Sequence, residues 1–206
     1  SFCTGTLITE KTVLTAAHCL ADENGDLMNI AIEVVFDTEV SEQSPSVLAE
    51  KRIVHSGYDA AATINSSSRS PGNDIGLIIL ESSAPASYIP VKVAPTGFQA
   101  GEKLFLAGFG TTVGPYSNDG GKLRHVSVEV SELTSFRNTF SAKTLGKGVC
   151  SGDSGGPAFI QDDHDEFFVA GVASTSATIA GFICTAPDTW TDASLFHQWI
   201  DLHKEI

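Results

Sequence analysis

Residues 150–157 read CSGDSGGP, and Ser154 stands among three glycines and a proline. Glycine adopts positive φ angles, lets a substrate approach the backbone and leaves N–H groups free to face a negative oxygen. A turn without chemistry would use the same residue types. The carboxylate of Asp153 directly before the serine is unusual in such a turn, so the stretch predicts a nucleophilic serine.

Two further stretches supply the partners that a nucleophilic serine needs. His18 ends the apolar run TVLTAAH, where a buried core histidine is the alternative. Asp74 opens NDIGLIIL, where a carboxylate that caps a turn is the alternative. A buried carboxylate is costly unless it is paired. Serine attack, proton transfer to histidine and orientation of that histidine by a carboxylate require these three residue types together, which favours the catalytic interpretation of all three.

The composition excludes several partner classes. With 206 residues and 42% hydrophobic content, the chain is long enough to bury a sizeable core. The net charge is −13, and we expect no nucleic-acid partner because phosphate backbones need a basic face. No run approaches the length of about 18 apolar residues that crosses a membrane, so no membrane partner is expected. The acidity indicates a solvated surface, with attraction of basic partners as the alternative.

Short apolar runs separated by turn-forming clusters predict a β-rich chain. One helix is predicted over residues 192–206, capped by Asp192 or Ser194, because its apolar side chains fall on one face. Residues 88–103 have no clear period and predict a linker, with a domain boundary near residue 96. The predicted strands are residues 5–9, 12–18, 30–36, 51–56, 75–81, 103–109, 123–130, 157–161, 166–174 and 181–185.

The stretches TAAHC, NDIGLIIL and GDSGGP resemble, in this order, the three signature stretches of the chymotrypsin-like (trypsin family) serine proteases. AGFGTT after the linker and the terminal helix with Trp199 and Ile200 are similar to the same family. The resemblance spans nearly the whole chain. It implies an all-β fold of two packed antiparallel six-stranded β-barrels with a C-terminal helix. Residues 1–95 would form the barrel with His18 and Asp74, and residues 96–206 the barrel with Ser154 and the substrate pocket.

The resemblance also implies a role for each matching residue. Ser154 would attack the substrate, His18 would take its proton and Asp74 would orient the imidazole. The backbone N–H groups of Gly152 and Ser154 would form the oxyanion hole. Ser174 would border Asp74 and begin a segment, residues 174–176, that pairs with the substrate backbone.

The pocket for the substrate residue before the scissile bond (P1) departs from the trypsin branch. Gly148 stands where that branch has an aspartate at the pocket base, and Asp188 stands where the family usually has glycine. Crustacean collagenolytic proteases look similar in this pairing. We therefore expect a P1 preference that includes Arg or Lys, with the alternative that Asp188 turns away or bonds a backbone N–H. The expected pocket residues are Gly148, Val149, Ser151, Ser174, Thr175, Ser176 and Asp188.

The four cysteines allow three pairings, among which the sequence does not choose. Sequential pairing, Cys3 with Cys19 and Cys150 with Cys184, is the simplest. It would anchor the His18 segment and indicates an oxidising compartment, so we expect a secreted, extracellular or periplasmic protein.

In the family's active form, the amine of a new N-terminal Ile or Val pairs with the aspartate that matches Asp153. The resemblance thus makes Asp153 activation-linked and implies a zymogen. The first residue of this sequence, Ser1, aligns inside the strand of Cys3, beyond that N-terminus.

The leading hypothesis is a serine endopeptidase that works through an acyl-enzyme. The alternative is a catalytically silent binding or regulatory protein with the same fold, and hydrolysis of non-peptide esters is a side reaction that the same machinery would allow. We expect protein or peptide substrates, protein inhibitors as partners, and a monomer. No cofactor or metal is expected, since the histidines form no ligand cluster.

Overall fold

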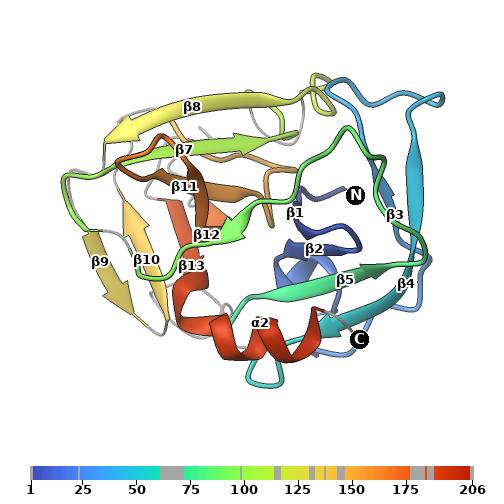
Figure 1. Ribbon diagram of the computed structural model, residues 1–206, viewed down its shortest axis with the longest axis horizontal. Helices are drawn as coiled ribbons and strands as arrows, with labels where there is room; N and C mark the ends of the chain where they lie inside the picture. The colour runs from blue at the N-terminus through green and yellow to red at the C-terminus, as the bar shows by residue number, and fades with distance from the viewer. Residues whose placement is uncertain are drawn as a thin grey trace.

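In the computed structural model, the chain folds into two β-sheets (Figure 1). The described residues are 2–22, 24–60, 72–97, 99–113, 117–129, 133–136, 138–142, 147–176, 184 and 188–204. The all-β class is confirmed. The described strands form one sheet of five strands and one of eight, where the resemblance implied two barrels of six.

The first sheet is antiparallel, and its central strand is β5 (Gly76–Leu80). Every residue of β5 is buried, as expected for a continuous apolar run covered on both faces. The strands, in spatial order, are β1 (Thr6–Thr9), β2 (Thr12–Thr15), β5 (Gly76–Leu80), β4 (Ser46–Val54) and β3 (Glu33–Val35).

The second sheet runs across the other half of the molecule (Figure 1). Strand β6 (Lys92–Val93) pairs in parallel with β12 (Phe167–Ser176), although β6 precedes the domain boundary expected near residue 96. The boundary itself stays a prediction. In spatial order the other strands are β8 (Arg124–Glu129), β7 (Lys103–Gly108), β11 (Pro157–Gln161), β12 (Phe167–Ser176), β13 (Asp188–Asp192), β10 (Thr139–Ala142) and β9 (Leu133–Phe136).

Two local expectations need correction. The strand expected over residues 12–18 ends at Thr15, and Ala17–Cys19 form the 3₁₀ turn η1, because the amide of His18 bonds a side chain and leaves the strand ladder. The terminal helix is also shorter than expected. It consists of the 3₁₀ turn η2 (Ala193–Phe196) and α2 (His197–His203), and the side chain of Asp192 accepts a hydrogen bond from the amide of Ser194 at its start. The strand expected over residues 181–185 lies outside the described residues except for Cys184.

A shared core joins the two halves of the molecule. Leu14 and Leu77 of the first sheet pack in one buried cluster with Val172, Phe196 and Ile200. In Figure 1, α2 lies across the lower edge of both sheets. Within the described part of the chain, no helix is long and apolar enough to cross a membrane. The shared core fixes the position of η1 relative to the loop before β11, and these two segments carry His18 and Ser154.

Candidate active site

His18 lies on turn η1 and makes two hydrogen bonds to one carboxylate, that of Asp74. The backbone N–H of His18 donates to Asp74 Oδ1 at 2.9 Å, and Nδ1 lies 2.7 Å from Asp74 Oδ2. The imidazole is 30% exposed, whereas the carboxylate is fully buried. A histidine held at Nδ1 in this way presents Nε2 as the atom that can accept a proton.

Asp74 occupies the entry to the fully buried strand β5 and has donors around it. Besides the two groups of His18, the hydroxyl of Ser174 on β12 donates to Asp74 Oδ2 at 2.6 Å. Thr191 on β13 fixes the backbone, since its hydroxyl donates to the carbonyl of Asp74 at 2.9 Å. A buried carboxylate is stable only with such partners. These contacts bring Ser174 beside Asp74.

Two opposing effects set the pKa of His18. Burial lowers the pKa of the imidazole, because it penalises the charged form. The negative charge of Asp74 and its hydrogen bond both raise the pKa of His18 and together outweigh burial, so the pKa lies above its ordinary value of 6.5.

The backbone of Ser154 lies against the segment that carries His18. Its carbonyl accepts a hydrogen bond from the amide of Thr4 at 2.8 Å and lies 3.7 Å from the sulfur of Cys19. The following amide, that of Gly155, donates to the carbonyl of Ala173 on β12 at 2.8 Å. Neither the hydroxyl of Ser154 nor His18 Nε2 is bonded to another described residue. Among the described residues, the structure therefore brings His18 to Asp74 but shows no hydrogen bond that joins Ser154 Oγ to His18.

The turn around Gly152 has the geometry that its glycines predict. Gly152 has a φ of 97° and Gly155 a φ of 80°, a region that favours glycine. The carbonyls of Gly152 and Ser154 are both held by Thr4. The amides of Gly152 and Ser154 donate to no other described residue, so both N–H groups are available for an oxyanion.

Asp153 turns away from that side and inserts its carboxylate between two backbone segments. Oδ1 accepts the amide of Gly110 at 2.7 Å, and Oδ2 accepts the amide of Cys150 at 2.8 Å. Burial raises the pKa of Asp153, and the two hydrogen bonds and the charge of Arg124 oppose this rise. A cavity of about 250 Å³ lies beside the carboxylate and is lined by Gly110, Arg124 and Val149 among others.

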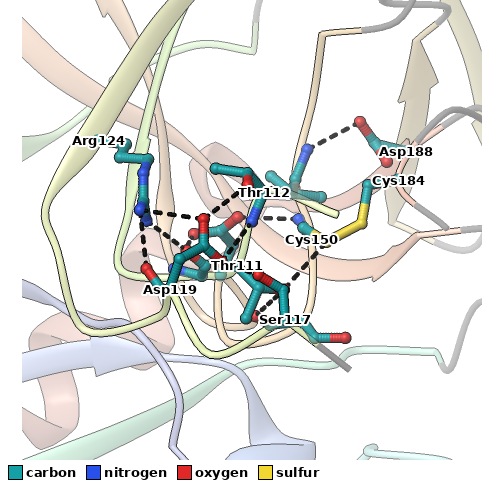
Figure 2. Close-up of a disulfide and its surroundings, with 12 residues drawn as sticks. Thr111, Thr112, Ser117, Asp119, Arg124, Cys150, Cys184 and Asp188 are labelled. Carbon is teal, nitrogen blue, oxygen red and sulfur yellow. Dashed lines mark hydrogen bonds and ion pairs between the residues drawn. A yellow bond between two sulfur atoms is a disulfide. The ribbon is translucent and has the colours of Figure 1, made fainter. Parts of the chain in front are cut away.

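A hydrogen-bond network around Arg124 and Asp119 lies beside the carboxylate of Asp153 and reaches the carbonyl of Gly110; Figure 2 shows its side chains. Arg124 donates to the carbonyls of Gly110 and Asp119 at 2.9 and 2.7 Å, and its charge lies 3.3 Å from the Asp119 carboxylate. Hydrogen bonds from Ser117 and Thr112 lower the pKa of Asp119 to about 2. The network fixes the backbone that binds Asp153.

The expected P1 pocket residues lie on three segments, 148–151, 174–176 and Asp188, and Asp188 contacts the first of these segments. Asp188 is 1% exposed, and its Oδ2 accepts the amide of Val149, next to Gly148, at 3.1 Å (Figure 2). One carboxylate oxygen thus bonds a backbone N–H, as the alternative expectation had it. The other expected members are dispersed: Thr175 is half-buried opposite Thr189 on β13, Ser151 is exposed beside Thr111, and the side chain of Ser176 lies outside the described residues.

The structure joins the cysteines sequentially, Cys3 to Cys19 and Cys150 to Cys184. Ligand atoms of Cys3, His18 and Cys19 lie within 4.8 Å of one another. Because both sulfurs are in a disulfide, this group offers no thiolate to a metal.

Sequence reasoning missed several residues that shape the site. Thr4 and Thr191 are buried hydroxyls whose partners lie more than a hundred residues away, at Gly152 and Asp74. Asn73 has a φ of 52° and sits directly before Asp74, a position where a left-handed asparagine indicates a special turn. No local pattern in the sequence identifies such long-range partners.

Two packed β-sheets with a histidine bonded to a buried aspartate at their junction are typical of the chymotrypsin-like class of serine proteases. A family model described as Trypsin matches residues 1–200. The chain is 30% identical to a trypsin of Phaedon cochleariae over all of this chain and 80% of that protein. It is 31% identical to the serine protease SP24D of Anopheles gambiae over 96% of this chain and 70% of that protein.

Human azurocidin is 28% identical to this chain over 97% of the chain and 76% of its own length. Among solved structures, mouse neuropsin, a serine protease expressed in the limbic system of the brain, superposes with a TM-score of 0.77. The superposition covers 99% of this chain and 89% of neuropsin at 24% identity, which supports the fold. The chain belongs to the trypsin family of serine proteases.

Proposed function

We propose that the protein is a serine endopeptidase in which Ser154, His18 and Asp74 form the catalytic triad. The observation that carries the proposal is the 2.7 Å contact between His18 Nδ1 and a fully buried Asp74 carboxylate. That contact fixes the tautomer in which Nε2 is an acceptor and stabilises the imidazolium that forms after proton transfer. Few structural roles require a histidine to be held so closely by a buried carboxylate while its side chain stays 30% exposed.

The reaction proceeds by two acyl transfers. Ser154 Oγ attacks the peptide carbonyl as its proton moves to His18 Nε2, and the amides of Gly152 and Ser154 bind the negative oxygen. His18 then gives the proton to the leaving amine, which leaves an acyl group on Ser154. Water, deprotonated by the same nitrogen, attacks this ester and releases the second product.

The P1 preference in this proposal includes Arg and Lys. Asp188 is a buried carboxylate beside Gly148 and Val149, at the wall of the expected pocket. A cationic side chain that reaches this wall would meet the negative charge in a site of low dielectric, where the attraction is strong. Substitution of Asp188 by glycine should remove the basic preference, and a profile dominated by Phe, Tyr or Leu in both proteins would overturn it.

Asp153 is the activation-linked residue of this proposal. Its buried carboxylate borders the cavity of about 250 Å³, and the negative charge of the carboxylate would attract a cationic group that enters the cavity. We assign this cavity to an N-terminal amine released by cleavage of a zymogen. In this proposal the protein is secreted, acts as a monomer on protein or peptide substrates, and is subject to protein inhibitors.

Hydrolysis of a P1-varied fluorogenic peptide library by wild type and Ser154→Ala tests the proposal. Turnover by the wild type alone supports the triad. Equal hydrolysis by both proteins would show that Ser154 is not the nucleophile. A wild type that has been cleaved to its active form, keeps its fold and turns over no member would favour the silent binding homologue.

A further inference from the structure

The hydroxyl of Thr4 connects three segments at the back of the oxyanion site. Oγ1 donates to the carbonyl of Gly152 at 2.9 Å and accepts a hydrogen bond from the amide of Phe109 at 3.1 Å. The residue is 4% exposed, and its hydroxyl acts both as a donor and as an acceptor.

The backbone of Thr4 adds two contacts on either side. Its amide donates to the carbonyl of Ser154 at 2.8 Å, and its carbonyl accepts the hydroxyl of Thr15 on β2 at 3.0 Å. Its neighbour Cys3 is bonded to Cys19, directly after His18. One residue of the first half therefore holds the carbonyls of Gly152 and Ser154, the two residues whose amides are the expected oxyanion donors.

Gly152 needs such support more than its neighbours do. Its φ of 97° lies in a region open to glycine, and a residue without a side chain rotates easily about both backbone bonds. Its amide donates to no other described residue, and it lies in one planar peptide unit with the carbonyl of Ser151, which accepts the amide of Thr111 at 2.9 Å. The orientation of this unit also depends on how the next peptide unit, which carries the carbonyl of Gly152, is held. The hydrogen bond from Thr4 holds the carbonyl end of Gly152.

We infer that Thr4 is a positioning residue that directs the amide of Gly152 towards the oxyanion. The inference rests on the proposed function. An oxyanion donor acts chiefly in the transition state, because it must point to where charge develops. Loss of the Thr4 hydroxyl should therefore lower kcat and leave KM nearly unchanged.

The test uses Thr4→Val, which keeps the branched shape and removes the hydroxyl, beside Thr4→Ser, which keeps the hydroxyl. Thr12→Val is the matched control. Thr12 is also buried, and its hydroxyl also donates to a backbone carbonyl, that of Lys204 at 2.5 Å, at the terminal helix. The three variants are assayed with the best peptide of the library.

For Thr4→Val we expect kcat to fall by about 10- to 100-fold with KM within about threefold, less than the about 10²- to 10³-fold loss of a whole oxyanion donor. Thr4→Ser and Thr12→Val should stay within about threefold of wild type. The affinity for a peptide trifluoromethyl ketone, whose serine adduct carries an oxyanion, should fall in Thr4→Val by the same factor as kcat/KM.

Three outcomes would overturn the inference. The first is an active enzyme in which Thr4→Val has the same kcat as the control Thr12→Val. That result would overturn the positioning role of Thr4 and leave the proposed function intact. The second is a loss that Thr4→Ser shares in full, since the hydroxyl would then not be responsible. The third is a wild type without turnover or reaction with the ketone, which would overturn the proposed function and with it the positioning role.

Discussion

Replacement of Asp74 by asparagine should place the proton of His18 on the wrong nitrogen. The backbone N–H of His18 lies 2.9 Å from Asp74 Oδ1, so the amide oxygen of the new side chain must occupy that position. The amide NH₂ then faces His18 Nδ1, which lies 2.7 Å from Oδ2 in the wild type. His18 Nδ1 would have to accept a hydrogen bond, and its proton would move to Nε2.

A histidine protonated at Nε2 cannot take the proton of Ser154. We expect Asp74→Asn to lower kcat by about 10⁴-fold, the size of loss typical of such a tautomer change. The pKa of His18 should also change direction. Burial lowers it and Asp74 raises it, so removal of the charge should leave His18 with a pKa below its ordinary 6.5.

Two measurements check this prediction. Steady-state kinetics with the best library peptide gives kcat between about pH 5 and about pH 9. Histidine NMR of the free enzyme follows both the tautomer and the pKa of His18. The reasoning is refuted if Asp74→Asn keeps more than about a tenth of the wild-type kcat, or if the His18 pKa does not fall.

Other predictions concern stability and the oxyanion turn. Joint replacement of Cys3 and Cys19 by alanine opens a loop of sequence separation 16 and should lower the free energy of unfolding by about 3 kcal/mol, measured by denaturant titration. Gly152→Ala should lower kcat by at least about 10²-fold, because φ is 97° and the new Cβ would lie 2.6 Å from the Phe2 ring; wild-type kcat would contradict this. Burial and the nearby charge of His203 lower the pKa of His55 in the folded protein. The unfolded chain therefore binds a proton at this residue more readily, and the free energy of unfolding decreases as the pH falls below 6.5. His55→Gln should therefore lose less stability than wild type between about pH 7 and about pH 5, and parallel pH profiles would exclude this.

The sequence predicted the residues that share a local signature. His18 and Asp74 each had a structural alternative, and the three short stretches with His18, Asp74 and Ser154 pointed to catalysis only when taken together; the structure brings His18 to Asp74. The apolar run after Asp74 similarly predicted a buried strand, and in the structure every residue of Gly76–Leu80 is buried.

The sequence did not predict features that depend on distant partners. A strand was expected to continue through His18, because the apolar run TVLTAAH has no visible stop. The chain instead turns after Thr15, where the His18 amide bonds Asp74, 56 residues away. Thr4 was equally inconspicuous, since a threonine before a strand is common and its partner lies 148 residues further on. Tertiary hydrogen bonds, which leave no local pattern, decided both.

The terminal helix shows a smaller error of the same kind. Its apolar face was evident, and the cap was left open between Asp192 and Ser194, of which the structure has Asp192. The first turn is nevertheless 3₁₀, and the α-helix spans only His197–His203. The side chain of Asp192 bonds both the amide and the hydroxyl of Ser194, which tightens that turn.

The most direct test of the central claim is a search for the acyl-enzyme. The protein is mixed with an activated peptide ester, quenched in acid and mapped by mass spectrometry. The triad predicts one acyl group, on Ser154, that is absent in Ser154→Ala and forms far more slowly in His18→Ala. A folded wild type with no acyl group on Ser154, or with acylation that does not depend on His18, would contradict it.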